Sequence, residues 1–105
     1  IEWRPSAETD AADTALWFAR QGGMALGVRF LAELEATLQR IALVPASGST
    51  RHADRAAQLP GPLRFMPASS FDRYLIYYVD LPECVHVMRV WCVDRGLDHL
   101  MQDIS

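Results

Sequence analysis

Residues 73–96, RYLIYYVDLPECVHVMRVWCVDRG, decide the fold of this 105-residue chain. The stretch contains two runs rich in β-branched and aromatic residues, a composition typical of β-strands. The Leu81-Pro82-Glu83 segment between them has the length of a hairpin loop. Both runs are apolar at nearly every position, and successive side chains of a strand point to opposite faces. Both faces of the predicted sheet therefore need a cover.

Upstream of this stretch the sequence predicts two helices. Residues 5–23 have Ser6 as a possible N-cap, acidic residues in the first turns and a Gly22-Gly23 stop. Residues 25–45 repeat apolar positions every three or four residues and end at Pro45. Because the Gly-Gly link is so short, we expect an antiparallel helical hairpin. The expected apolar stripes consist of Ala11, Ala12, Ala15, Leu16, Phe18 and Ala19 in the first helix and Phe30, Leu31, Leu34, Leu38 and Ile41 in the second.

The remaining segments complete an α+β domain. Residues 1–4 are a short strand candidate, residues 46–62 a long loop rich in Gly, Pro, Ser and mixed charges, and residues 63–68 another strand. A short C-terminal helix must dock on something, because a helix of that length is not stable alone; its apolar face is Leu97, Leu100, Met101 and Ile104. We predict a single domain over residues 1–105: an N-terminal strand, the helical hairpin packed on a mostly antiparallel sheet of about four strands, and the short C-terminal helix.

Composition narrows the classes of function. The net charge of −3 disfavours broad nucleic-acid binding, which needs a basic surface. The sequence has no apolar run near the ~20 residues of a membrane span and no visible secretory signal. Cys84 and Cys92 would lie roughly 26 Å apart in one extended segment, which is too far for a disulfide. Two reduced thiols without a signal predict a cytoplasmic protein.

The order of the elements resembles that of the RelE/ParE toxin superfamily of bacterial type II toxin–antitoxin systems. The most specific pieces are RYLIYYV at residues 73–79 and VHVMRVWCVDRGLDHLM at residues 85–101. The resemblance covers nearly the whole chain and depends on the order and spacing of elements rather than on one motif. It implies the fold predicted above and a small cytoplasmic toxin.

The resemblance also implies partners. A ParD-like antitoxin would neutralise the toxin in a hetero-oligomer, its apolar C-terminal segment wrapping the helical hairpin and an exposed sheet surface. Contact with a membrane is not expected. For the second face of the sheet two alternatives stay open: a partner segment covers it, as large apolar patches at interfaces suggest, or the loop at residues 46–62 and the C-terminal helix cover it.

Members of the superfamily act in two ways. RelE-like toxins cleave mRNA on the ribosome, whereas ParE-like toxins inhibit DNA gyrase by contact. Cleavage by 2′-OH attack needs groups that move protons and stabilise the phosphate, and RelE-like toxins use Lys and Arg on the sheet and a C-terminal Tyr. Here all ten basic residues are Arg, the C-terminal segment has no Tyr, and only Arg95 matches a basic position after the last strand.

We therefore interpret the chain as a ParE-like toxin with DNA gyrase as its target, without direct nucleic-acid binding, cofactor or catalytic residues. The alternatives are a RelE-like mRNA endonuclease and a toxin-like domain kept as an interaction module. His52, His86 and His99 are scattered and form no metal-ligand pattern with the cysteines, so we expect no metal site. The three tyrosines of the strand at residues 73–80 are expected to be packing residues.

The candidate partner-contact residues lie in the strands and the C-terminal segment. Arg89 and Trp91 share one strand face, and Arg and Trp are the most frequent interface hot spots. The alternative for Arg89 is a surface salt bridge or a stem that covers the sheet. The predicted contact set is Arg64, Arg73, Arg89, Trp91, Arg95, Leu100 and Met101.

Overall fold

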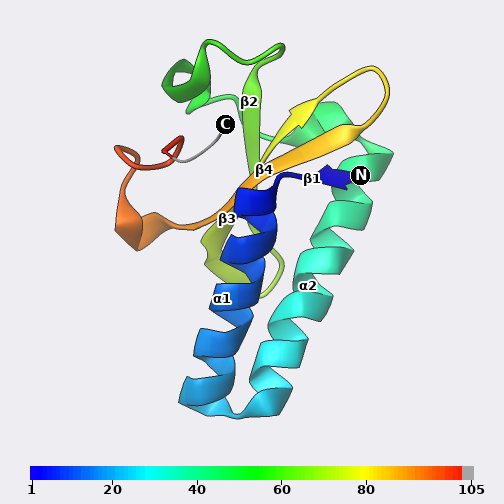
Figure 1. The fold of residues 1–105 in the computed structure, drawn as a ribbon. Coiled ribbons are helices and arrows are strands. Elements are labelled where there is room, and N and C mark those ends of the chain that lie inside the picture. Colours follow the sequence, from blue (N-terminus) through cyan, green and yellow to red (C-terminus); the bar gives the residue numbers. More distant parts are fainter. Residues whose placement is uncertain (103–105) are drawn as a thin grey trace.

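The computed structural model describes residues 1–102 and confirms the α+β fold, with a helical hairpin packed on a four-stranded sheet (Figure 1). The strands and helices are β1 (Glu2–Trp3), α1 (Pro5–Gly22), α2 (Met24–Leu43), β2 (Leu63–Ala68), β3 (Phe71–Asp80) and β4 (Val85–Cys92). Short 3-10 turns occupy Pro45–Ser47, Ala53–Ala56 and Val93–Arg95.

The strands are arranged in the order β1-β4-β3-β2. The β2–β3 and β3–β4 pairs are antiparallel, as predicted for consecutive strands, whereas β1 runs parallel to β4. Because β1 has two residues, it pairs only with His86 and Val87. The outer edge of β4 beyond Val87 is therefore not paired with a strand, and α1 passes along it.

The two ends of α1 follow different local rules. Arg4 occupies the N-cap position and Pro5 the first turn, so the prediction that Ser6 caps the helix is wrong. Pro at this position has the helical φ already fixed and lacks an N–H that would need a partner. The Ser6 hydroxyl instead donates to the Met88 carbonyl oxygen at 3.3 Å, which attaches α1 to the edge of β4. At the other end, Gly23 has φ of 96°, a backbone conformation that favours glycine, and it separates α1 from α2 in a single residue.

The hairpin packs against one face of the sheet through part of the predicted apolar stripes. Phe30, Leu34, Leu38 and Ile41 are buried there together with small α1 residues and the inward side chains of β3 and β4. The prediction that Ala12, Leu16 and Leu31 belong to the buried stripes is wrong, because all three are exposed. Their side chains lie on the far side of the hairpin, away from the sheet.

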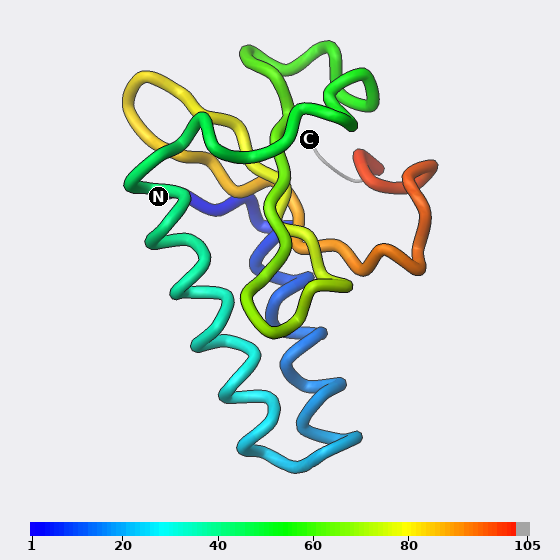
Figure 2. The backbone as a smooth tube through the Cα atoms, turned by 180° about the vertical axis from the view of Figure 1, so that it is seen from behind, coloured from blue at the N-terminus to red at the C-terminus, as the bar shows by residue number. Residues whose placement is uncertain are grey.

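The other face of the sheet is covered by the chain itself. Ala56 and Leu59 from the loop, and Leu97, Leu100 and Met101 from the C-terminal segment, pack on the apolar side chains of β3 and β4. Figure 2 shows the loop (green) and the C-terminal segment (red) near each other, on the side of the strands away from the helical hairpin. Of the two alternatives for this face, the structure therefore has internal cover.

The C-terminal segment covers the sheet without forming an α-helix. After the 3-10 turn at Val93–Arg95, the chain continues in turns through Gln102. The predicted docking of Leu100 on the sheet is present, although the helical geometry is not. Ile104, the last position of the predicted apolar face, lies outside the described residues.

The loop that begins at residue 46 is fixed to the sheet by polar groups. The buried Tyr78 hydroxyl donates to the Pro45 carbonyl oxygen at 2.6 Å and accepts from the Gly48 N–H at 2.9 Å. The Arg64 guanidinium donates to the carbonyl oxygens of Ala46 and Gly48. These bonds satisfy backbone groups that no helix or strand pairs, which explains how so long a loop stays attached to the domain.

Candidate functional site

A buried ion pair joins α1 to β4. Arg89 Nε and Nη2 donate to the two carboxylate oxygens of Asp10, each at 2.8 Å. Asp10 Oδ2 also accepts from the Val90 N–H at 3.1 Å, and both side chains are less than a tenth exposed. The two-pronged geometry is that of a strong charge-assisted pair. Sequence reasoning missed Asp10; the available signal was its place beside Ala7 and Ala11 on the buried stripe of α1.

The same arginine holds the C-terminal segment. Arg89 Nη1 donates to the carbonyl oxygens of Leu100 at 3.3 Å and Gln102 at 3.0 Å. Its guanidinium lies 4.5 Å from the centre of the Trp91 ring, and the Arg95 guanidinium lies 3.9 Å from the same centre. Trp91 is 1% exposed, and its indole N–H donates to the Gly96 carbonyl oxygen at 2.6 Å. The stack therefore fixes the position of Arg95 next to the end of β4.

The seven predicted contact residues have different surroundings. Arg89, Trp91 and Leu100 are buried within the domain, whereas Arg95 is exposed. Arg64 is half-buried and binds the loop carbonyls, Arg73 is exposed and paired with Asp94, and Met101 packs on the second sheet face. Arg89, Trp91, Arg95 and Leu100 are thus brought together at one end of β4. Contact of any of the seven with a partner stays a prediction.

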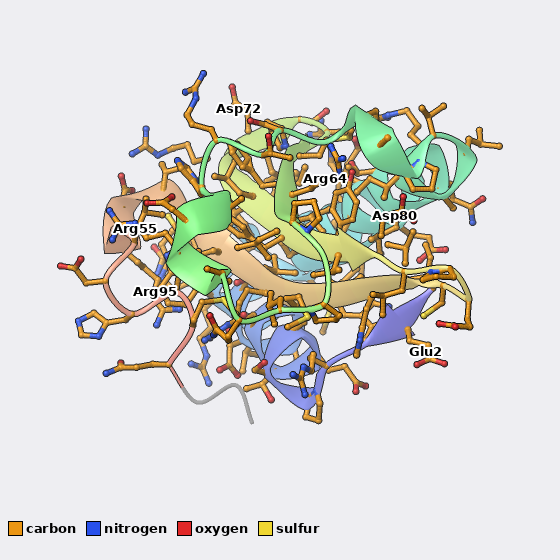
Figure 3. All side chains as sticks on the ribbon, turned by 90° about the horizontal axis from the view of Figure 1, so that it is seen from above. Glu2, Arg55, Arg64, Asp72, Asp80 and Arg95 are labelled. Carbon is orange, nitrogen blue, oxygen red and sulfur yellow. The ribbon has the colours of Figure 1, made fainter. Side chains whose placement is uncertain are left out.

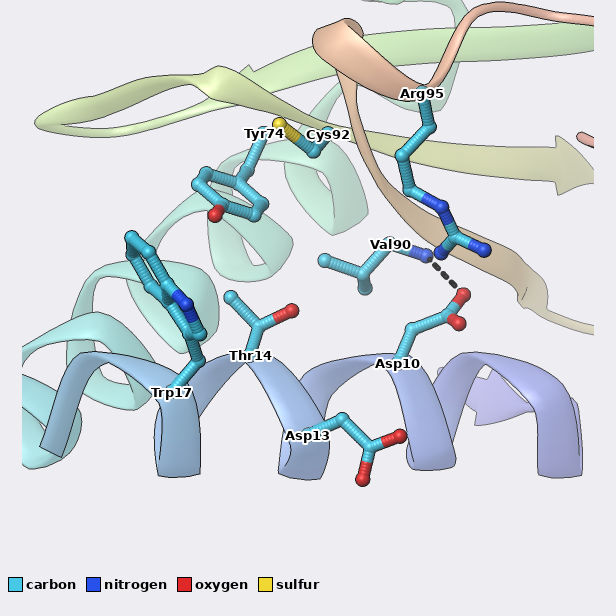
Figure 4. Close-up of a pocket in the computed structure, with 8 residues that line it drawn as sticks. All are labelled: Asp10, Asp13, Thr14, Trp17, Tyr74, Val90, Cys92 and Arg95. Carbon is cyan, nitrogen blue, oxygen red and sulfur yellow. Dashed lines mark hydrogen bonds between the residues drawn. The ribbon is translucent and has the colours of Figure 1, made fainter. Parts of the chain in front are cut away.

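A small hollow, which we call the Arg95 cavity, opens beside this cluster. It has a volume of about 190 Å³ and lies between α1 and the end of the sheet. Figure 4 shows its lining of Asp10, Asp13, Thr14, Trp17, Tyr74, Val90, Cys92 and Arg95. Burial raises the pKa of Tyr74, so this hydroxyl stays protonated at neutral pH. The cavity therefore combines aromatic walls with the Arg95 guanidinium, the Thr14 and Tyr74 hydroxyls and two carboxylates, of which Asp10 is already engaged by Arg89 and Asp13 is exposed.

A second polar contact lies under the loop. The nitrogen Nδ1 of His52 is 2.8 Å from the Tyr77 hydroxyl, and its ring stacks on Phe65 with 4.6 Å between the ring centres. Burial raises the pKa of Tyr77 to about 12, while burial and the charges of Arg51 and Arg55 lower the pKa of His52. Both groups are therefore neutral at pH 7 and attach the loop to β3.

The histidines and cysteines do not gather into a metal site. Within residues 1–102, no three His, Cys, Asp or Glu side chains are placed to hold a metal ion together. Both cysteines are free thiols. Over the same described range, the model contains no helix with the length and apolar character needed to cross a membrane.

The outer side of the helical hairpin carries an apolar surface, which we call the hairpin groove. Its floor consists of Ala15, Ala19 and Gly27, and its rim of Leu16, Met24, Val28 and Leu31. A Cβ on Gly27 would meet the Ala15 carbonyl oxygen at 2.6 Å, so the helices approach too closely there for a larger residue. Leu31 also lines a neighbouring hollow with Trp3, Glu8 and Ala12. The groove therefore extends along the hairpin from its tip toward β1.

The hairpin groove could have been predicted from the apolar residues of the two helices. Leu16 and Val28 are 50% and 59% exposed, and Met24 is 76% exposed. Both helices carry apolar residues around more of their circumference than one packed face requires. Surplus apolar residues at helical spacing mark a second, outward face, and contiguous exposed apolar patches of this kind mark interaction sites.

Comparison with known proteins agrees with this architecture. The family model described as the ParE toxin of the type II toxin–antitoxin system parDE matches residues 1–95. Comparison with curated proteins gives no match. The matched range contains both helices, all four strands and the Asp10–Arg89 pair, and it ends at Arg95. The chain therefore belongs to the ParE toxin family of type II toxin–antitoxin systems.

Proposed function

We propose that this toxin arrests growth in the cytoplasm by binding DNA gyrase, and that its cognate ParD-like antitoxin neutralises it by direct contact. Membership of the ParE toxin family supports an antitoxin partner. The observation that carries the proposal is the hairpin groove, because it is an apolar surface left exposed after both faces of the sheet are covered. Action by protein contact needs such a surface.

The hairpin groove suits an apolar antitoxin segment. Its floor of small residues lets a bound segment approach the backbones of both helices, and its larger rim residues can interdigitate with partner side chains. Its two hollows measure about 200 and 320 Å³, each large enough for apolar side chains of the partner. An amphipathic helix with apolar residues three and four positions apart matches this shape. Since both sheet faces are covered, the exposed apolar surface that supports an antitoxin contact is the one on the hairpin.

The chemistry of the chain favours inhibition by contact over RNA cleavage. The chain has no Lys, so the Lys of RelE-like toxins has no counterpart. Its three tyrosines all lie in β3, where Tyr77 and Tyr78 are fully buried and Tyr74 is partly buried. None of them lies in the segment after β4, where RelE-like toxins carry a Tyr.

Two assays test the proposal together. The protein encoded beside this chain should co-purify with it, and the purified toxin should inhibit gyrase supercoiling until that antitoxin is added. A translation extract programmed with mRNA provides the counter-test. Cleavage of the mRNA with supercoiling unaffected would establish the endonuclease alternative instead. A toxin that affects neither assay but binds its neighbour would fit the interaction-module alternative and refute gyrase inhibition.

A further inference from the structure

The Arg95 cavity has the size of a site for one side chain. Its volume of about 190 Å³ is enclosed by α1 on one side and by Tyr74, Val90, Cys92 and Arg95 on the other. Three of these four residues belong to the last two strands, and the α1 residues occur one turn apart on a single helix face. The walls therefore come from elements fixed by the core, which is the arrangement that gives a binding site a defined shape.

One guanidinium beside the cavity is left without a carboxylate partner among the described residues. Arg89 and Arg95 supply two guanidinium groups around Trp91, and among residues 1–102 Asp10 is the one carboxylate that pairs with either of them. Asp10 is fully engaged, since it accepts two bonds from Arg89 and one from the Val90 N–H. Within the described residues, Arg95 has no carboxylate within 4 Å. Arg89 and Asp10 neutralise each other, which leaves the Arg95 guanidinium, held by the Trp91 ring, as the charged donor beside the cavity. The Asp13 carboxylate also lines the cavity, and it is exposed to water.

Further hydrogen-bond donors line the cavity. The Val90 N–H points outward from β4 because it donates to Asp10. The β3–β4 register is continuous from Tyr77–Arg89 to Tyr74–Cys92, so the Cys92 N–H, two residues on, points to the same side. No strand covers this edge, because β1 ends opposite Val87. The Cys92 N–H and the Thr14 hydroxyl therefore add neutral donors to the guanidinium of Arg95.

The walls and the surroundings fit a protein side chain better than a nucleic acid. Trp17, which is 51% exposed, and Tyr74 offer aromatic surface to methylene groups. Figure 4 shows the Asp13 carboxylate directed away from Tyr74 and Cys92. Asp13 is exposed, so water weakens its repulsion of an anion. In Figure 3, Arg55 and Arg95 lie at one end of the sheet and Glu2 and Asp80 at the opposite end. Two arginines at one end of a chain of net charge −3, one of them paired with Asp98, do not form the long basic track that a phosphate backbone requires.

We infer that the Arg95 cavity binds a carboxylate side chain, Asp or Glu, of a protein partner, with Arg95 as its counter-ion. This inference rests on the proposed action by protein contact and specifies the chemistry that the contact would use. The carboxylate accepts from the Arg95 guanidinium and the Cys92 N–H, and its methylene groups lie against Trp17 and Tyr74. The bound carboxylate would be the counter-ion of Arg95, as Asp10 is of Arg89.

The test is a titration of the isotope-labelled full chain with N-acetylglutamate, followed by the NMR signals of the Cys92 N–H and the Arg95 Nε–H. Both signals should shift and saturate. The neutral isostere N-acetylglutamine should bind at least about tenfold more weakly, because charge-assisted hydrogen bonds are lost. Arg95→Gln should weaken N-acetylglutamate binding by a similar factor. Arg20→Gln, an exposed change at the hairpin tip, should leave it unaltered and serves as the matched control.

Several outcomes would overturn the inference. Equal responses to N-acetylglutamate and N-acetylglutamine, or no saturable shift at Cys92, would remove the carboxylate site. Tighter binding of inorganic phosphate than of N-acetylglutamate would assign the cavity to a phosphate-bearing partner instead. The Trp91 indole N–H signal reports folding in every variant, because that group is bonded to Gly96. The proposed function is judged separately by the supercoiling assay. Inhibition of gyrase without carboxylate binding at the cavity refutes this inference alone. Carboxylate binding without inhibition of gyrase refutes only the gyrase proposal.

Discussion

Replacing Asp10 with alanine should destabilise the domain far more than removing a charge from an exposed ion pair. The substitution leaves the Arg89 guanidinium, now 7% exposed, without its counter-ion and the Val90 N–H without its acceptor. Removing one partner of a buried ion pair costs ~3–5 kcal/mol, because the remaining charge stays desolvated. A domain of this size is stable by ~5–15 kcal/mol, so the variant would lose at least about a fifth of its stability, and nearly all of it if the domain is marginal.

Urea denaturation of the wild type and of Asp10→Ala measures this loss. Asp94→Ala is the matched control, since it removes the same group from the exposed Arg73–Asp94 pair. Exposed pairs contribute ~0–1 kcal/mol, so the control should be nearly neutral. Equal, small losses for both variants would refute the claim that burial makes the Asp10–Arg89 pair different.

A double-mutant cycle separates the pair from its surroundings. Arg89→Met alone leaves the Asp10 carboxylate buried without a counter-ion and frees the carbonyl oxygens of Leu100 and Gln102. The double variant Arg89→Met with Asp10→Leu removes both charges. Its loss of unfolding free energy should be smaller, by at least ~1.5 kcal/mol, than the summed losses of the single variants Arg89→Met and Asp10→Leu. Additive losses would mean that the two side chains do not act as a pair.

Four further outcomes follow from the contacts. Tyr78→Phe removes the hydroxyl that binds Pro45 and the Gly48 N–H, so urea denaturation should give a loss of ~1–3 kcal/mol, and a neutral change would contradict the loop attachment. As pH falls, the unfolded chain takes up a proton on His52 before the folded chain does, because the pKa of His52 is lowered in the folded state. The free energy of unfolding should therefore be highest above pH ~6.5 and should fall as pH drops through the folded pKa. Urea denaturation at several pH values should show a flatter pH profile for His52→Gln. Arg95→Ala should change stability by less than ~1 kcal/mol while growth arrest weakens, and undiminished toxicity would return Arg95 to ordinary surface charge. Val28→Asp in the hairpin groove should change stability by ~0.5 kcal/mol or less yet abolish co-purification of the antitoxin, and retained binding would move the antitoxin contact elsewhere.

The secondary structure was predictable because its signals are local. Apolar repeats of three and four residues, the glycines at 22 and 23 and the β-branched runs act within a few residues of each other, so the hairpin and the strands were found near their observed bounds. The errors came from competing local signals. Serine is a favourable N-cap residue, but Pro5, which precedes Ser6, fits the first turn of a helix. The helix therefore begins at Pro5, with Arg4 as its N-cap residue.

The buried pair could not be predicted, because Asp10 and Arg89 are 79 residues apart and neither residue type signals burial by itself. Sequence reasoning treated Arg89 as a surface residue for partners, whereas the fold brings one carboxylate opposite it and makes it an internal anchor. The sequence could not show which segment covers the second sheet face, for the same reason. Apolar residues on both strand faces predict that each face is covered, but they do not indicate which segment covers it.

The sequence alone determined the α+β class, the order of elements and the resemblance to the toxin superfamily, since periodicity and element order are properties of the chain. Only the tertiary structure decided which charges are buried and which are available. The close approach of α1 to the unpaired edge of β4 neutralises Arg89 and leaves Arg95 exposed beside a cavity. Such pairings depend on distances between residues far apart in sequence, and these distances exist only once the core has packed.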